Sequence, residues 1–303
     1  MSNTSMLNDA LAEHQDKKYY RLIFATSTNH DLSDLSLQLH GITGFYANEY
    51  FQPVKRIGRI FNVISDESVF KGHYGVSAVV IPYNTREQIE KNYDLALEEL
   101  CEEYSLENIH FSEIFGQKVL GNRRSEFIKK YVDIVNELEM WSVSFSVNRS
   151  KFVAQLPISD KSDRAIKFLL FWNTFESLVE KMPKGSIFHI YFERDNYLSE
   201  DLLVESIRKL HSGLRQCQAI KPQEGSICIH PLVFTKKALF YSSISDLAAY
   251  SNTLIQQKLD HGIPASKVIA NHRELIETTK SVFKYVMSVH QSKQSAAELI
   301  LGV

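Results

Sequence analysis

The chain has 303 residues, of which 44% are hydrophobic and 23% charged, and its formal net charge at pH 7 is −2. These values are typical of a soluble globular protein with a sizeable core, and the near-neutral charge excludes a broadly basic surface, so contact with nucleic acid depends on a local patch. Three widely spaced cysteines without a Cys-x-x-Cys pair, no leader-like N-terminus and no long apolar run predict a reducing, cytoplasmic location and no membrane span.

Residues 1–57 form a predicted N-terminal extension without a clear pattern. Basic residues gather at its end, immediately before the first predicted core strand: Lys55, Arg56 and Arg59. They fit either a solvated charge cluster or a local patch that contacts phosphate groups. Arg123 and Arg124, further along the chain, are candidates for the same role.

An apolar strand pattern over residues 61–64 leads directly into two adjacent carboxylates, Asp66 and Glu67. We expect these acids to emerge at the carboxyl end of a core strand, where α/β proteins often place their chemistry. A plain strand-to-turn boundary is the alternative, because acids and serines are common where strands stop. A second strand over residues 74–81 follows closely enough to form an antiparallel hairpin with the first.

Helical and strand patterns then alternate along the chain, which predicts an α/β fold. Helices are expected over residues 85–104, 124–140, 160–182, 199–214 and 241–259, and strands over residues 141–147, 187–194 and 225–229. The helix over residues 160–182 is apolar nearly all round, which is typical of a central core helix or a subunit interface.

Several polar residues stand where packing does not require them. His110 and Glu113 lie in a short mixed segment, and Glu193 and Asp195 follow the strand that begins at residue 187. Asp246 fits a capping-box-like pattern with Ser243, in which the acid only satisfies a helix N-terminus. Taken together, however, acids at two strand ends and one helix start are the arrangement that a two-metal phosphoryl-transfer site requires, because Mg²⁺ and Mn²⁺ prefer carboxylate oxygens.

Three segments carry a family resemblance: Asp-Glu-Ser at residues 66–68, Ile-His-Phe-Ser-Glu-Ile-Phe at residues 109–115, and Ser-Asp-Leu-Ala-Ala-Tyr at residues 245–250. In this order and spacing they resemble the domain-of-unknown-function family 3800, which has Asp-Glu-Ser-Gly, His-x-Ser-Glu/Asp and Ala-Asp-Leu motifs. The chain departs from that pattern at Val69, where the family has Gly, and at Ser245, where it has Ala.

The resemblance implies an RNase H-like mixed central sheet flanked by helices over residues 58–262, with residues 263–303 as a helical C-terminal extension. It implies that Asp66, Glu67, His110, Glu113 and Asp246 are site residues. It also places Glu193, or Asp195 in its stead, at the third acid, so that the metal ligands are Asp66, Asp246 and one of these two. Relatives in this family often occur near mobile elements and phage-defence genes.

These features predict a nuclease or related phosphoryl-transfer enzyme that uses Mg²⁺ or Mn²⁺ and acts on RNA or on short or structured DNA. The alternative is a catalytically inactive RNase H-like module that binds a protein partner. An apolar stripe in residues 274–289 and the helix over residues 160–182 favour a homodimer or a hetero-complex.

Overall fold

The computed structural model describes residues 19–20, 52–53, 60–82, 90–117, 119–155, 187–193, 228–234, 238–289 and 295–301, together with Leu170, Thr174 and Leu178. Two compact units make up the chain. The first comprises residues 1–63 and 179–234, and the second comprises residues 64–178 and 235–303. Lys55, Arg56, Arg59, Asp195 and the helix predicted over residues 199–214 lie outside the described residues.

In the first unit, β1 (Tyr19–Tyr20) pairs in antiparallel fashion with β2 (Gln52–Pro53). Strand β6 (Ile187–Glu193) confirms the strand predicted there, and it pairs in parallel with β7 (Cys228–Phe234). The strand predicted over residues 225–229 therefore has the wrong bounds, since β7 begins at Cys228 and continues through Pro231. A proline is tolerated because β7 is at an edge of the strand order, where one side of the strand needs no ladder hydrogen bonds.

The second unit contains a mixed sheet in the order β3-β4-β5-β8, flanked by helices. Its strands are β3 (Ile60–Phe70), whose first residues count with the first unit, β4 (His73–Pro82), β5 (Met140–Asn148) and β8 (Phe283–Val289). β4 and β5 pair antiparallel, whereas β8 lies parallel to β5. The predicted hairpin is confirmed: only Lys71 and Gly72 separate β3 from β4, and both have positive φ, as a tight hairpin turn requires.

The position of the two acids on the first strand was predicted wrongly. Asp66 and Glu67 lie within β3, which continues to Phe70, and not at its end. The strand continues because the hairpin ladder extends past the buried core toward solvent, and there polar side chains on a paired strand cost nothing. Accordingly, Ile64 is fully buried, whereas Asp66 and Glu67 are only half-buried.

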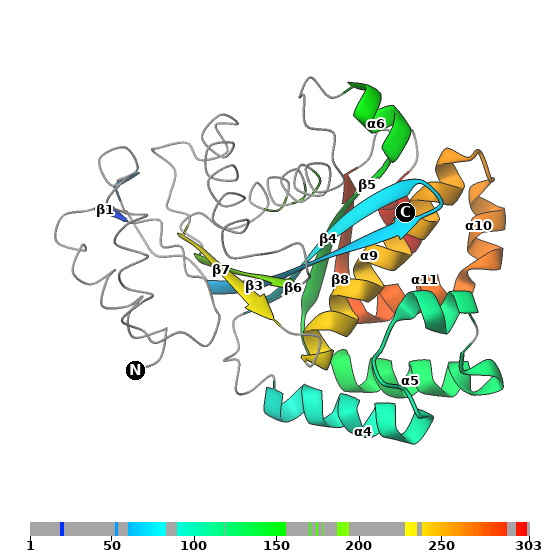
Figure 1. Cartoon of the computed structure of the whole chain (residues 1–303), viewed down its shortest axis with the longest axis horizontal. Helices are drawn as coiled ribbons and strands as arrows, with labels where there is room; N and C mark the ends of the chain where they lie inside the picture. Colours follow the sequence, from blue (N-terminus) through cyan, green and yellow to red (C-terminus); the bar gives the residue numbers. More distant parts are fainter. Residues whose placement is uncertain are drawn as a thin grey trace. The chain divides into compact units, whose positions relative to one another are not determined.

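The long helix α9 (Leu239–Asp260) is the central element of this unit and packs against β4 and β5 (Figure 1). Nearly all of its residues from Leu239 to Gln257 are buried. Small side chains on the sheet allow the close approach: a Cβ on Gly75 would lie 1.8 Å from the Thr253 Oγ1 atom. The serines of β5 are buried as well; they are Ser142, Ser144 and Ser146.

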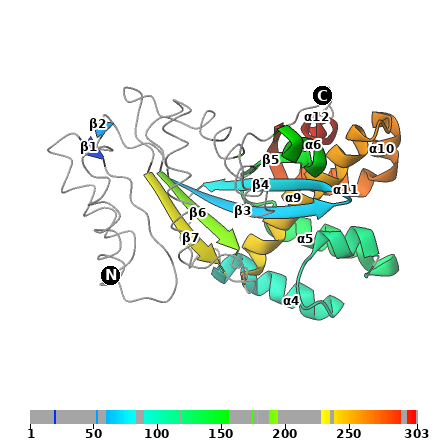
Figure 2. The same ribbon diagram turned by 45° about the horizontal axis from the view of Figure 1, so that its top comes forward.

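Two helices cover the side of α9 that faces away from the sheet (Figure 2). They are α4 (Leu95–Tyr104), preceded by the π-helical η1 (Glu90–Asp94), and α5 (Arg124–Val135), preceded by the short η3 (Gly121–Arg123). The predicted helix over residues 124–140 is shorter than expected, because Met140 already begins β5. Of the helix predicted over residues 160–182, three described residues are helical and buried: Leu170, Thr174 and Leu178.

The C-terminal segment completes the second unit. It comprises α10 (Ala265–Asn271), α11 (Arg273–Val282), β8 and α12 (Ala296–Leu301), while α6 (Arg149–Gln155) follows β5. The C-terminal extension predicted as helical over residues 263–303 is not helical throughout, since the chain changes to a strand at Phe283 and joins the sheet. Most of its predicted stripe is buried inside the chain, namely Leu275, Ile276, Val282 and Val286. In the described part of the chain, no helix combines the length and apolar character needed to cross a membrane.

Candidate functional site

Strand β4 connects Asp66 to helix α9. Counted outward from the two-residue turn, Asp66 falls opposite Ser77, so their side chains share one face of the hairpin. The Ser77 hydroxyl donates a hydrogen bond to the backbone carbonyl oxygen of Ser245 at 3.2 Å, and both serines are buried. This contact brings the face of the hairpin that carries Asp66 against the part of α9 where Ser245 and Asp246 lie.

Asp246 connects α9 to the central motif. Its Oδ2 atom accepts a hydrogen bond from the backbone N–H of Phe111 at 2.6 Å. Phe111 immediately precedes the π-helical segment η2 (Ser112–Gln117), whose first N–H groups need acceptors. The capping-box prediction for Asp246 is therefore wrong. α9 begins at Leu239, so Asp246 is well inside the helix and caps a different element.

Two tyrosines lie close enough to Asp246 for its negative charge to affect their pKa values. Burial raises the pKa of the Tyr131 and Tyr250 hydroxyl groups, and the negative charge of Asp246 raises both further. Tyr131 donates a hydrogen bond to the Ser243 hydroxyl at 3.2 Å. Tyr250 lies beside η2, since a Cβ on Gly116 would be 3.7 Å from its hydroxyl oxygen. Asp246 thus lies among residues of α5, α9 and η2.

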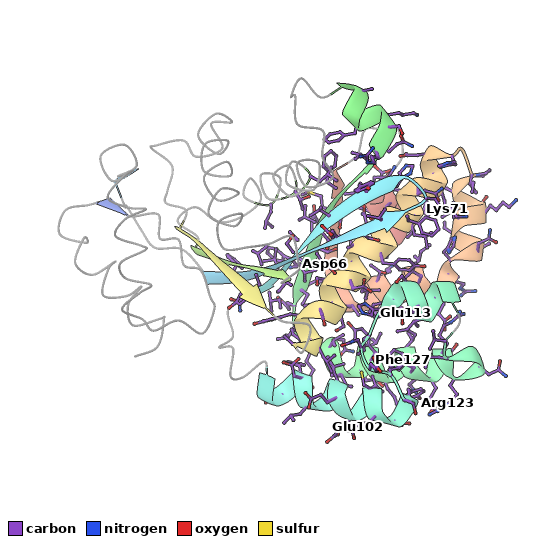
Figure 3. The ribbon with its side chains drawn as sticks, viewed as in Figure 1. Asp66, Lys71, Glu102, Glu113, Arg123 and Phe127 are labelled. Atoms are coloured by element: carbon purple, nitrogen blue, oxygen red, sulfur yellow. The ribbon has the colours of Figure 1, made fainter. Side chains whose placement is uncertain are left out.

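The other motif residues have defined local positions. The Oδ1 atom of Asp66 accepts a hydrogen bond from the Glu67 backbone N–H at 2.7 Å. His110 is half-buried, and its carbonyl oxygen accepts the N–H groups of Glu113 and Ile114 at 3.1 and 3.0 Å. Glu113 is exposed in the first turn of η2. Figure 3 shows Asp66 on β3 and Glu113 beside the helices below it.

The three segments that carry the family resemblance therefore meet around the first half of α9. Asp246 contacts the His110–Phe111 segment directly, and Asp66 is connected to Ser245 through Ser77. The sequence did not predict a role for Ser77. Its only signal is a hydroxyl inside an otherwise apolar strand, between Val76 and Ala78.

The third predicted acid, Glu193 or Asp195, stays a prediction. Glu193 ends β6 in the first unit, and Asp195 lies outside the described residues. Within the described ranges, no group of three or more His, Cys, Asp and Glu side chains is placed to hold a metal ion. The donor chemistry of Asp66 and Asp246 nonetheless fits Mg²⁺ or Mn²⁺, because both residues supply carboxylate oxygens, which these cations prefer.

The two described arginines of the predicted phosphate patch contact other parts of the chain. Arg124 forms an ion pair with Glu274, with an N–O distance of 2.7 Å, and Ser125 binds the other oxygen of that carboxylate. The Arg123 guanidinium lies 4.2 Å from the centre of the Tyr104 ring. Arg124 therefore links α5 to α11, and Arg123 packs against α4. Both contacts stabilise the fold.

Comparison of the sequence with protein-family models finds no match, and a search of curated proteins finds none either. Inference about function thus depends on the motifs and on the contacts between them.

Proposed function

We propose that this chain is a divalent-metal-dependent nuclease or related phosphoryl-transfer enzyme with an RNase H-like core. The observation that carries the proposal is the convergence of three sequence motifs on one helix. Asp246 accepts a hydrogen bond from Phe111 at 2.6 Å, and Ser77 joins the Asp66 face of the hairpin to Ser245. Segments 135 residues or more apart in sequence come together there.

The sheet supports the same proposal. In the second unit, β4 and β5 pair antiparallel and β8 lies parallel to β5, so that its sheet is mixed, and helices flank it. A mixed sheet with flanking helices is what the resemblance implies. The fold alone would not imply an activity, which is why the proposal depends on the motif contacts.

In the proposed site, Asp66 and Asp246 would hold the metal ions. The bound metal would activate a water molecule and stabilise the leaving oxygen. Asp246 is held in place by the Phe111 N–H, and Asp66 by the Glu67 N–H. His110, which is half-buried, would orient water or protonate the leaving oxygen, and Glu113 would complete the site, since Glu67, next to Asp66 in β3, points to the opposite face of the hairpin.

Substrates of the proposed enzyme are RNA or short and structured DNA, because a chain with a net charge of −2 has no broad basic surface for long duplexes. The proposal includes a cytoplasmic location and a role in phage defence or in a mobile element.

Metal binding and cleavage in charge-removing variants test the proposal. Asp66→Asn and Asp246→Asn keep the side-chain size, so we expect both to remain folded. Each should lower Mn²⁺-dependent cleavage of RNA or single-stranded DNA by about 10²–10⁴-fold, and calorimetry should show weakened Mn²⁺ binding. Asp133→Asn, an exposed acid on α5, is the matched control and should behave like the wild type.

The double variant Asp66→Asn/Asp246→Asn should be hardly worse than either single variant, because ligands of one metal site act as a unit. Wild-type cleavage in either single variant would refute the site. Absence of any specific Mn²⁺ heat in the wild-type protein would instead favour the second candidate, a catalytically inactive module.

One observation favours that second candidate. Strand β8 is at the edge of the strand order in its unit, and its Tyr285 side chain is 44% exposed. An exposed aromatic on an edge strand is a common element of protein interfaces. A homodimer or hetero-complex that uses β8 would show a mass above that of the monomer in light scattering, and Tyr285→Ser would reduce it.

A further inference from the structure

The tip of the β3–β4 hairpin gathers basic and aromatic side chains from three elements. We name Phe70, Lys71 and Lys258 the hairpin-tip cluster; Tyr74 and Arg149 lie on the opposite face of the hairpin, because Tyr74 follows His73, the partner of Phe70 across the turn. The Lys71 and Lys258 ammonium groups lie 5.6 and 5.4 Å from the centre of the Phe70 ring. The Arg149 guanidinium lies 5.8 Å from the centre of the Tyr74 ring.

Two helices, α6 and α9, lie beside the tip of the β3–β4 hairpin. The Arg149 N–H donates to the Gly72 carbonyl oxygen at 2.9 Å, which fixes the start of α6 beside the hairpin turn. Lys258 stands in the last turn of α9, next to the same hairpin. Figure 3 shows Lys71 at the tip and Asp66 further back along the same strand.

The lysines of the cluster differ from several other basic residues of this unit. Those residues pair with acids, as in Arg124–Glu274, Lys130–Glu103 and Lys284–Glu139. Within the described ranges, no ion pair joins Lys71 or Lys258 to a carboxylate.

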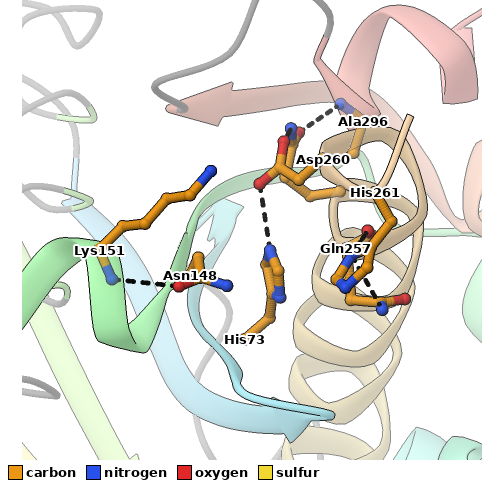
Figure 4. Close-up of polar contacts among 8 residues, drawn as sticks. His73, Asn148, Lys151, Gln257, Asp260, His261 and Ala296 are labelled. Atoms are coloured by element: carbon orange, nitrogen blue, oxygen red, sulfur yellow. Dashed lines mark hydrogen bonds and ion pairs between the residues drawn. The ribbon is translucent and has the colours of Figure 1, made fainter.

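The nearest acid in sequence, Asp260, is bound elsewhere. Its Oδ2 atom is 3.1 Å from the Nε2 atom of the fully buried His73, and its Oδ1 atom accepts a hydrogen bond from Gln256 at 2.9 Å (Figure 4). Asp260 is therefore bound to His73 and Gln256 within the chain. The surrounding segment, residues 261–273, contains no acid and adds Lys267 and Arg273.

We infer that the hairpin-tip cluster binds single-stranded nucleic acid, with the ammonium groups on phosphates and the Phe70 ring against a base. Phe70 and Lys71 are half-buried and exposed, so a ligand reaches both. Stacking on an aromatic ring needs a base that is not already stacked in a duplex, which favours a single strand. The inference deepens the proposed function, since it names the surface that would present a substrate to Asp66.

The spacing along β3 agrees with that role. Asp66 and Phe70 are four residues apart on the same face, which separates their Cα atoms by about 13 Å in an extended strand. At about 3.4 Å per stacked nucleotide, a strand bound at Phe70 would reach Asp66 within about four nucleotides. Arg123 and Arg124, which the sequence favoured for phosphate contact, are instead tied to Tyr104 and Glu274.

Binding measured without divalent metal tests the inference independently of cleavage. The probe is a fluorescent single-stranded RNA of about 12 nucleotides, titrated with protein in EDTA between about 50 and 200 mM salt. Lys71→Gln/Lys258→Gln should weaken binding on the order of 10-fold and lower the salt slope by about 1.4, at about 0.7 for each lost phosphate contact with a single strand. Phe70→Leu keeps an apolar side chain and should weaken binding on the order of 10-fold at an unchanged salt slope.

Lys130→Gln/Lys284→Gln removes the same number of lysines, but from ion pairs with Glu103 and Glu139, and serves as the control with wild-type affinity and slope. Thermal melts of all variants confirm that they are folded. Equal losses in the control pair, unchanged binding in the cluster variants, or binding to phosphatidylserine vesicles in place of RNA would overturn the inference. Asp66→Asn should keep RNA affinity in EDTA, so failure of the metal site and failure of the binding surface give different results.

Discussion

The two sides of helix α9 differ in chemistry. Toward the sheet, the interface is built from small and polar groups: Gly75 lies against Thr253, Ser77 donates to Ser245, and His73 pairs with Asp260. Toward α4 and α5, it contains aromatic rings, as in the Tyr93–Phe240 pair, whose centroids are 4.8 Å apart; the Phe111–Tyr131 pair, 5.1 Å apart, joins the segment before η2 to α5.

The difference separates two tasks. Burial of large apolar surface stabilises the fold but tolerates small shifts, because it is not directional. Hydrogen bonds and the close contact between Gly75 and Thr253 define the distance between α9 and the strands. They thereby also define where Asp246 lies relative to the face of the hairpin that carries Asp66. The polar side of α9 positions the candidate site, and the aromatic side stabilises the unit that carries it.

The largest effect is expected on the aromatic side. Phe240→Ala removes a fully buried ring at the start of α9 and should lower the free energy of unfolding by about 3–5 kcal/mol. Phe240→Leu, which keeps most of the volume, should cost clearly less. Urea unfolding measures both. Equal losses in the two variants would show that ring packing against Tyr93 is not what stabilises this end of the helix.

On the polar side, the tightest contact should come next. Gly75→Ala places a methyl group 1.8 Å from the Thr253 Oγ1 atom, so α9 must shift or Thr253 must rotate, at a cost of about 1–3 kcal/mol. Thr253→Ala in the same chain should restore part of the loss. Metal affinity should fall together with stability, because the shift separates α9 from the hairpin. A variant with full metal affinity would argue against positioning by this contact.

Alkaline pH should weaken the aromatic side. The pKa values of Tyr131 and Tyr250 are raised in the folded chain by burial and by Asp246, whereas unfolded tyrosine ionises near pH ~10. The contribution of each is therefore fully present below pH ~10 and is lost as the pH rises toward the folded pKa, by at most about 1.4 kcal/mol per pH unit. Denaturation at increasing pH should be shallower in Tyr250→Phe than in the wild type. Identical pH curves would exclude Tyr250 as a cause.

The smallest expected change concerns Ser77. Ser77→Ala removes the hydrogen bond to the Ser245 carbonyl oxygen and should cost about 1 kcal/mol of stability. Its effect on Mn²⁺ affinity should be larger than that of Ser150→Ala, an exposed serine on α6. If both serine variants bind Mn²⁺ equally well, Ser77 acts on stability alone.

The sequence by itself determined the elements whose pattern is local. The hairpin from Ile60 to Pro82 and the strands at Met140 and Ile187 follow from period-two patterns and a two-residue turn. It also identified the three motif segments, since their residue types are visible without a fold.

Tertiary structure decided what those residues contact. Asp246 looked like a cap for its own helix, but the fold places α9 so that its carboxylate reaches Phe111, 135 residues away. Residues 283–289 have a pattern that suits a helix or a strand, and the free edge of β5 makes them a strand. The pairing of Arg124 with Glu274 and the contact of Lys258 with the Phe70 ring likewise depend on long-range packing. Local periodicity predicts an element, but only the packing of distant segments determines which charges meet.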